Sequence, residues 1–369
     1  MDDILLRELA NADLDWMADH GVRSSLAPGE VLIDPKQPQR SLYLLISGQL
    51  GLTFPDAAEG AATVSPELVE QIVPGEIVGA APLFEAESAA QVVALTPAQV
   101  LALNLDLLQV KLRQDVPFAA RLYRAIAVMY TTRLRRIFAQ PGRVRLWGSH
   151  SRQEALTIFC ELYNSDLDWL VSFGEIQTLR PGQLLVRAGR PVDALYVVLD
   201  GKLAVSAPAP GLNPLELGFV KSDQPSQGST AFATIDRGEL PGIISFLDLR
   251  PMPVTMSAQQ ETYLLAVPRP VVTTKLQVDG GFAIRFYRVI VGQILDLLQT
   301  VGESLATEPI PPLPEAQDGA MNGQGMADLM DDLMDEMENE ELALESLQNL
   351  SEGAAKFNWM LQRLGVSHG

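Results

Sequence analysis

Residues 26–48 read LAPGEVLIDPKQPQRSLYLLISG, and residues 179–201 read LRPGQLLVRAGRPVDALYVVLDG. The two stretches align without a gap at a displacement of 153 residues, so that Tyr43 matches Tyr196. The Pro-Gly pair near the start and the glycine at the end of each stretch match in the same register. Similarity at a fixed displacement indicates a repeated structural unit, and the chain therefore contains a duplicated domain.

Each copy reads as short strands separated by turns. Pro28 and Gly29 form a turn dipeptide, because proline presets the first backbone angle and glycine accepts a positive one. The apolar, partly β-branched runs at residues 31–33 and 42–46 then predict two strands, and Gly48 closes the second one. Strands this short, broken this regularly, indicate a compact β-barrel or β-roll and not a parallel sheet with helical crossovers.

The order of these features resembles a known family. Pro-Gly-Glu, a strand, a polar turn, a Leu-Tyr-hydrophobic run and Gly-x-Leu are similar to the first half of the cyclic nucleotide-binding domain, the β-roll of catabolite activator protein and of cyclic-nucleotide-regulated kinases and channels. The resemblance covers about residues 10–138 and 163–301 and implies an α+β fold of two tandem rolls with flanking helices. The expected units are a first domain at 1–148, a second domain at 149–304, a Pro/Gly-rich linker at 305–325 and an acidic, Met-rich helical tail at 326–369.

The net charge of −19 is concentrated towards the C-terminal end of the 369 residues. Thirteen acidic residues and no Lys or Arg lie between Glu308 and Glu352, which leaves −6 for the rest of the chain. Nucleic-acid binding draws most of its free energy from Lys and Arg at phosphates, so we expect no nucleic-acid partner.

The chain shows neither a membrane span nor a signal segment. No apolar stretch approaches the roughly 18 to 20 residues that span a bilayer, and the first residues, Met-Asp-Asp-Ile, are acidic. We therefore expect a cytoplasmic protein that does not insert into membranes.

Residues typical of catalysis or metal binding are few. Cys160 is the single cysteine, which rules out an intramolecular disulfide, and we expect it to be buried on a helix. His20, His150 and His368 do not stand at metal-ligand spacing. Because nucleophile-elbow and P-loop patterns are also missing, we expect no metal, no cofactor and no enzymatic activity.

The resemblance implies that a cassette after the first strands holds the ligand. In the family this cassette reads Gly-x-x-Phe-Gly-Glu-x-Ala-Leu-Leu and then Pro-Arg-x-Ala; amides at a short helix and the Arg hold the cyclic phosphate, while the Glu binds the ribose. In the first copy Ala80 stands at the Glu position, and Ser88 or Ala89 stands at the Arg position. Glu85 and Glu87 add negative charge where the phosphate would lie, so this site is expected to be degenerate.

The second cassette also departs from the family pattern. Ile243 replaces the Glu, and Met252 stands where the Arg is expected. Arg250 comes two positions early, so it is either a surface residue or an anion ligand that swings in. The candidate ligand-binding residues are Gly242, Ser245, Arg250 and Thr255.

Two amphipathic helices follow the cassettes. Apolar residues at steps of three and four predict them from Phe118 to Phe138 and from Phe282 to Val301, and both contain Phe-Ala-x-Arg-x-Tyr-Arg at a displacement of 164. Two alternatives remain for their apolar faces. They form a dimer interface, or they pack the two copies against each other.

The tail provides candidate partner-binding residues. A bacterial regulator of this family would continue into a helix-turn-helix, whereas this chain gives a Pro/Gly-rich linker. Beyond the linker, apolar residues at helical spacing among acidic ones, and then an aromatic end, are the candidates: Met326, Leu329, Met330, Leu333, Met334, Met337, Phe357, Trp359 and Leu361. Two alternatives remain: the tail docks into a protein partner through adaptable thioethers and aromatic anchors, or it lies on its own rolls.

The leading hypothesis is a non-enzymatic adaptor or regulatory protein with degenerate cyclic-nucleotide pockets that binds a larger assembly through its tail. The alternative is a sensor of a cyclic nucleotide or another small anion that uses the second domain.

Overall fold

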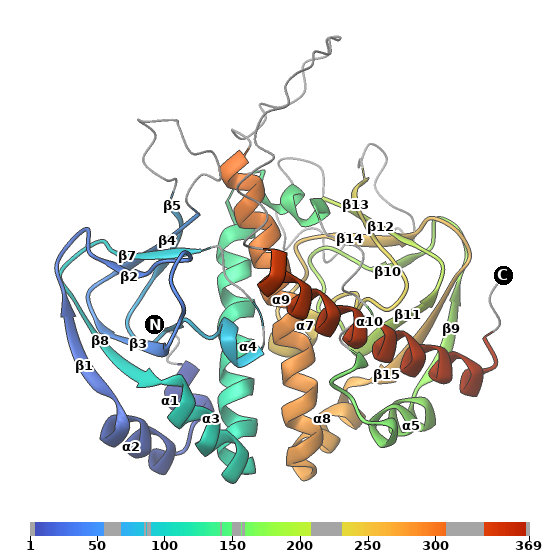
Figure 1. The fold of residues 1–369 in the computed structure, drawn as a ribbon. Coiled ribbons are helices and arrows are strands. Elements are labelled where there is room, and N and C mark those ends of the chain that lie inside the picture. The colour runs from blue at the N-terminus through green and yellow to red at the C-terminus, as the bar shows by residue number, and fades with distance from the viewer. Residues whose placement is uncertain are drawn as a thin grey trace, which may run out of the picture.

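The computed structural model describes residues 4–54, 68–84, 86, 90–140, 142–149, 156, 159–207, 231–307 and 336–366. Two β-rolls lie on either side of a central pair of long helices, and the C-terminal helix runs from these helices across the second roll (Figure 1). The expected α+β architecture, with two tandem rolls and flanking helices, is confirmed.

The first roll consists of two four-stranded antiparallel sheets, in the orders β1-β8-β3-β6 and β2-β7-β4-β5. Its strands are β1 (Val22–Leu26), β2 (Val31–Ile33), β3 (Ser41–Ser47), β4 (Leu50–Thr53), β5 (Leu68–Ile72), β6 (Ile77–Val78), β7 (Gln91–Ala94) and β8 (Ala98–Asn104). Its helical segments are α1 (Ile4–Glu8), α2 (Asn11–His20), η1 (Ala81–Phe84), α3 (Leu105–Gln114), α4 (Val116–Phe138) and η2 (Arg143–Ser149).

The second roll repeats this topology, with the orders β9-β15-β11 and β10-β14-β12-β13. Its strands are β9 (Glu175–Leu179), β10 (Leu184–Val186), β11 (Ala194–Asp200), β12 (Leu203–Ser206), β13 (Ala231–Ile235), β14 (Thr255–Ala258) and β15 (Thr262–Pro268). Its helices are α5 (Asn164–Phe173), α7 (Ile243–Asp248), α8 (Arg269–Val278) and α9 (Gly280–Thr307), and α10 (Glu336–Leu364) follows. No described helix combines the length and the apolar character needed to cross a membrane.

The repeated glycines close β3 and β11 because the turn leaves no room for a side chain. Gly48 and Gly201 have φ angles of 88° and 96°. A Cβ atom at Gly48 would lie 2.4 Å from the Pro97 carbonyl oxygen, and one at Gly201 would lie 2.6 Å from that of Glu261. Backbone conformation and close packing therefore both require glycine here.

A repeated ion pair attaches the helix that precedes each roll to the long helix that follows it. Arg121 of α4 donates from Nε and Nη2 to the two carboxylate oxygens of Asp13 at 2.6 and 2.9 Å. Arg285 of α9 binds Asp166 of α5 in the same way at 2.5 and 2.8 Å. Two-pronged pairs of this kind fix orientation as well as distance, so both copies hold their helices in the same arrangement.

The long helices α4 and α9 begin with the same cap and pack against each other along the centre of the molecule (Figure 1). Asp115 and Asp279 accept hydrogen bonds from the amides of Phe118 and Phe282 at 3.0 and 2.9 Å.

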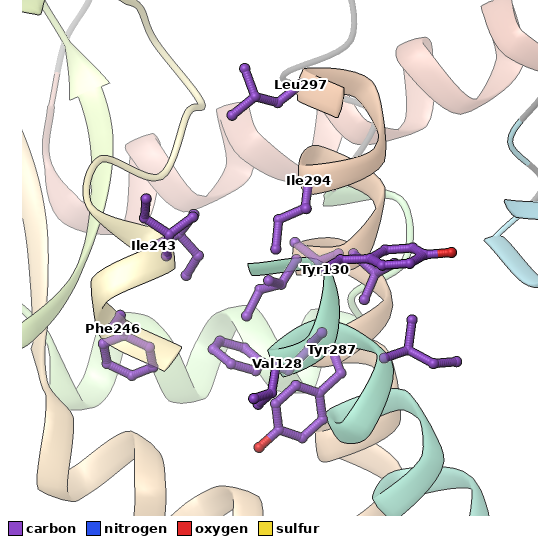
Figure 2. Packing of buried hydrophobic residues seen from close by; sticks show 14 of the residues in the cluster. Val128, Tyr130, Ile243, Phe246, Tyr287, Ile294 and Leu297 are labelled. Carbon is purple, nitrogen blue, oxygen red and sulfur yellow. The ribbon is translucent and has the colours of Figure 1, made fainter. Parts of the chain in front are cut away.

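Figure 2 shows the packed region, with Tyr130 of α4 beside Ile294 of α9 and with Ile243 and Phe246 of α7 on the other side. These helices, predicted from Phe118 to Phe138 and from Phe282 to Val301, were also candidates for a dimer interface. In the structure their apolar faces are buried within one chain, which corresponds to the alternative of packing the two copies together.

Candidate functional site

A cavity of about 820 Å³ lies in the first roll. The turn after β2, strands β4 and β7, η1 and α4 form its walls, and α9 of the second roll contributes Leu295, Leu298 and Gln299. Cavities of roughly 300 to 1,000 Å³ are typical of small-molecule sites. The candidate ligand residues predicted from the sequence are in the second roll, whereas this cavity is in the first.

The wall of the cavity is slightly more apolar than polar, and its polar groups come from a few places. Ala80, which stands where the family has its ribose-binding Glu, is fully buried in this wall. Polar groups are contributed by the turn at residues 34–39 and by Tyr130, Arg133 and Gln299. The apolar side chains that line it are Ile33, Leu52, Phe54, Val78, Val92, Leu295 and Leu298.

Arg133 brings a buried guanidinium to the cavity from α4. Its side chain is 3% exposed, and Nη2 donates to the Ile77 carbonyl oxygen at 3.0 Å and lies 3.5 Å from Oε2 of Glu76. Among the described residues, Nε is buried without a hydrogen-bond partner. An arginine keeps its charge when buried, so Arg133 places a permanent positive charge at the cavity wall.

Tyr130 lies one turn before Arg133, and its ring points away from Ile243 and Phe246 in Figure 2. The Arg133 guanidinium carbon lies 4.9 Å from the centre of the Tyr130 ring. Burial raises the pKa of Tyr130, and the nearby charge of Arg133 and the amide of Ala80 offset only part of this rise. The hydroxyl is therefore protonated at neutral pH and available as a hydrogen-bonding group at the cassette.

An ion-pair network lies behind the cavity. Arg136 of α4 contacts Glu76 from Nη1 and Nη2 at 2.7 and 3.0 Å, and its Nε lies 2.5 Å from Oε1 of Glu70. Burial raises the pKa of Glu70, although the charges of Arg136 and Arg133 counteract it. The contacts show that Arg136 is the main counter-charge of Glu76, and Arg133 makes only the longer contact.

Arg133 could have been recognised from the sequence as a candidate site residue, but the prediction of the helix did not use this signal. Apolar residues follow the buried stripe of α4 at Met129 and at Ile137, and Arg133 stands at the position between them. A charged residue in the apolar stripe of an amphipathic helix must meet a polar group or a ligand when it is buried.

The first cassette keeps the family's backbone but lacks its side chains. Gly79 has a φ of 79°, and a Cβ atom there would lie 3.0 Å from the Ser41 carbonyl oxygen. The cassette then turns into η1, whose Leu83 carbonyl accepts a hydrogen bond from Nη1 of Arg288 at 2.9 Å. Glu85, Glu87, Ser88 and Ala89, named in the sequence prediction, lie outside the described residues.

The candidate polar side chains of the second cassette form hydrogen bonds within the protein. The buried Ser245 hydroxyl accepts a hydrogen bond from the Val192 amide at 3.0 Å and donates to the Arg250 carbonyl oxygen at 2.7 Å. The Thr255 hydroxyl accepts from the Ala188 amide at 3.2 Å. Gly242 has a φ of 80° at the start of α7 and packs on Val192. The structure therefore gives Ser245 and Thr255 internal partners, and the Arg250 side chain is exposed.

Two arginines attach each roll to the cassette of the other. Arg135 of α4 donates to both carboxylate oxygens of Asp248 at 2.6 and 2.8 Å, and to the carbonyl oxygens of Pro251 and Arg250 at 2.7 and 3.1 Å.

On the other side, Arg288 of α9 binds Glu161 at 2.7 and 2.8 Å, in addition to the Leu83 carbonyl of the first cassette. Burial lowers the pKa of Arg288, but hydrogen bonding to Glu161 and the charge of that carboxylate raise it by more. Both contacts couple the position of one roll to the cassette of the other.

The tail candidates fall into two groups. Met326, Leu329, Met330, Leu333 and Met334 lie outside the described residues, and Met337 is in the first turn of α10. Phe357 and Leu361 are buried on the second roll, where the rings of Phe357 and Phe159 are 4.9 Å apart, and Trp359 is half-buried. This end of the tail therefore adopts the alternative in which the helix lies on its own roll.

Polar contacts accompany this docking. Lys356 donates from Nζ to the Cys160 carbonyl oxygen at 2.7 Å, and Arg237 donates to Oδ1 of Asn358 at 2.6 Å. The single cysteine, Cys160, was expected to be buried on a helix, but it is half-buried in a turn beside this contact. Within the described residues no group of three or more His, Cys, Asp or Glu side chains could hold a metal ion.

Comparison with known proteins identifies the repeated unit. Residues 23–115 and 176–279 match the family model of the cyclic nucleotide-binding domain. The regulatory domain of Toxoplasma gondii PKA with cAMP is 18% identical; the match covers 75% of this chain and 89% of that chain, with a TM-score of 0.27.

Two further solved structures are similar at the same level. Thermus thermophilus catabolite activator protein is 22% identical over 35% of this chain and 54% of that chain, with a TM-score of 0.28. The regulatory subunit of a cAMP-independent protein kinase A from Trypanosoma brucei is 16% identical over 75% of this chain and 92% of that chain, with a TM-score of 0.26. No curated protein matches the chain.

Proposed function

Because the chain belongs to the cyclic nucleotide-binding domain family, we propose that it is a non-enzymatic regulatory adaptor whose two rolls form one module and whose C-terminal segment binds a larger protein assembly. The family supplies the premise that such rolls bind and respond and do not carry out chemistry. We infer the adaptor role from the contacts that the cassettes of this chain make.

The observation that carries the proposal is the use of the second cassette. In the family, a cassette presents free donors to a phosphate. Here the Ser245 hydroxyl is bound by Val192 and Arg250, and the guanidinium of Arg135 is bound to two cassette carbonyls and to Asp248. The second cassette, which corresponds to the segment that binds a ligand in the family, thus binds the other roll in this chain.

The tail supports the adaptor role through its place in the chain. One end of the segment at 308–335 follows α9, which is packed in the centre of the molecule, and the other end continues into α10, which is docked through Phe357 and Leu361. The segment carries the Met-rich, acidic pattern, and flexible thioethers suit irregular partner grooves. The segment joins α9 to α10 in the chain, and we propose that a partner binds it.

The test is to change the apolar residues of this segment without changing its charge or length. We would replace Met326, Leu329, Met330, Leu333 and Met334 by Gln in the full chain and quantify the proteins that co-purify from the native cells. A matched control replaces the apolar linker residues Ile310, Leu313 and Met321 by Gln. Loss of specific partners in the first variant but not in the control is expected, and equal recovery from both would refute the role of the tail.

The alternative is an anion sensor in the second roll, and the exposed side chain of Arg250 beside the cassette is the observation that favours it. Calorimetric titration with cyclic AMP, cyclic GMP and cyclic dinucleotides separates the two functions. Binding tighter than about 10 μM, or roughly −7 kcal/mol, that is lost in Arg250→Ala would establish the sensor. We expect no such binding, because Ser245 and Thr255 are already hydrogen-bonded within the protein.

A further inference from the structure

The cavity of the first roll has a lining that does not suit a cyclic nucleotide. The position at which the family binds the ribose is Ala80, whose methyl group offers no acceptor for ribose hydroxyls. The remaining wall combines aliphatic side chains and the ring of Phe54 with the polar turn at residues 34–39. A ligand that fills this space gains most from an apolar body, because water leaves apolar surface on both sides of the contact.

One charged group of this wall is buried and incompletely bonded. Arg133 is 3% exposed, and its Nε has no hydrogen-bond partner among the described residues. Its nearest carboxylate, Glu76, is held at 2.7 and 3.0 Å by Arg136 and is 3.5 Å from Arg133. Arg136, which also contacts Glu70, makes the shorter contacts to Glu76, and the buried Nε of Arg133 is left able to donate to an anion.

From these two features we propose that the first-roll cavity binds an apolar carboxylate, whose anionic group pairs with Arg133 and whose apolar body fills the space beside Ala80. Tyr130, one turn away on the same helix, also lines the cavity, and we infer that its hydroxyl donates a second hydrogen bond to the carboxylate. A guanidinium and a hydroxyl from α4 thus replace the arginine that the family places in the cassette itself. The proposal does not depend on the adaptor role of the tail.

The second roll completes this site. Leu295, Leu298 and Gln299 of α9 line the cavity, so a ligand that fills it contacts both rolls at once. Arg135 of α4 occupies the repeat position of Gln299 and holds the second cassette. A ligand in the first roll would therefore bind more tightly when α4 and α9 are packed together than when they are separated. Its binding would thus favour the packed arrangement of the two helices.

The experiment compares three probes by calorimetry on the full chain: decanoate, 1-decanol and cyclic AMP. We expect decanoate to bind, and to bind at least about tenfold more tightly than 1-decanol, because charge-assisted hydrogen bonds to a buried guanidinium are lost in the alcohol. Cyclic AMP should bind more weakly than decanoate. If decanoate does not bind, if the alcohol binds as well, or if cyclic AMP binds more tightly, the proposal is wrong.

Variants locate the site. Arg133→Gln should weaken decanoate binding at least about tenfold, whereas the control Arg124→Gln, which removes a guanidinium of the same helix that pairs with Glu8 and does not line the cavity, should leave it unchanged. Leu298→Trp provides a second test that leaves the ion pairs intact: the larger side chain fills the cavity from α9 and should abolish decanoate binding. Unchanged binding in the Leu298→Trp variant would place the carboxylate elsewhere and would overturn the assignment.

Discussion

Arg135 of α4 and Asp248 of α7 form a two-pronged ion pair between the rolls, with Nε and Nη2 at 2.6 and 2.8 Å from the carboxylate oxygens. Both side chains are largely buried, at 14% and 7% exposure. The guanidinium also binds the carbonyl oxygens of Arg250 and Pro251, so it holds the cassette as well as the helix. One side chain of the first roll therefore holds the cassette of the second roll.

Removing this guanidinium should destabilise the protein strongly. Arg135→Met leaves the Asp248 carboxylate buried without its counter-charge, and breaking a buried pair in this way costs about 3 to 5 kcal/mol. The double variant Arg135→Met, Asp248→Asn should lose less than the sum of the two single variants, since it leaves no unpaired charge. Urea unfolding of the four proteins measures this difference.

The exposed pair between Arg363 and Asp168 provides the control for this cycle. Its side chains are 60% and 48% exposed, so Arg363→Met should cost less than about 1 kcal/mol. If the losses of unfolding free energy in the Arg135 and Asp248 single variants add up to the loss in the double variant, the ion pair between the two side chains contributes no stability of its own.

The repeated glycines give a second prediction. Gly48→Ala forces a side chain into a left-handed conformation and against the Pro97 carbonyl at 2.4 Å. Gly29 has a similar φ of 85°, and no atom lies within 4 Å of the point that a Cβ would occupy, so Gly29→Ala carries only the conformational cost of about 1 to 2 kcal/mol. The unfolding midpoint in urea should therefore fall further for Gly48→Ala, and equal midpoints would contradict the steric explanation.

These glycines also show why so much of the fold could be predicted from the sequence. Gly48 and Gly201 are required by local backbone geometry, and local requirements are repeated wherever the domain is repeated. The same holds for the caps at Asp115 and Asp279, which stand at matching positions before the two long helices. Strand length, turn position and helix start were predictable because each depends on neighbouring residues.

The candidate site was less predictable because it depends on neighbours that are distant in the chain. Arg133 reaches Ile77 and Glu76 only once α4 has packed on the first roll. Ser245 was a reasonable anion donor by type, but its hydroxyl is bonded to Val192 in the loop between β10 and β11. For Phe357 the sequence did not decide between packing within the chain and binding to a partner, because an aromatic anchor suits both.

Acid titration of Asp13 should lower stability. Burial raises the pKa of Asp13, but hydrogen bonds from Arg121 and the Ala10 amide lower it by more, so its pKa lies below the ordinary value of 3.8. A carboxyl group with a lowered pKa in the folded state stabilises the protein above its unfolded-state pKa, and this contribution is lost as the pH falls through the folded-state value. The stability difference between the native chain and Asp13→Asn should therefore be large at pH 7 and shrink below about pH 4.

Asp15 of the same helix provides the control, because its side chain is exposed. Asp15→Asn should change the urea midpoint little at pH 7. A difference between the native chain and Asp13→Asn that stays constant from pH 7 to pH 3 would contradict the assigned role of the Arg121 pair.

The docking of α10 depends on Phe357 more than on any other aromatic residue of that helix. Phe357 is fully buried against Phe159 and beneath the Arg237 guanidinium, which lies 5.0 Å from its ring centre. Phe→Ala changes in cores cost about 3 to 5 kcal/mol, and α10 is a peripheral helix, so the loss should release the helix and leave the rolls folded. Phe357→Ala should therefore speed amide hydrogen exchange in the segment from residue 348 to 364 by at least about 100-fold, with protection in α4 and α9 unchanged. Trp359→Ala, at a half-buried position on the same helix, should have a much smaller effect. Faster exchange throughout α4 as well would mean instead that the docked helix is part of one cooperative core.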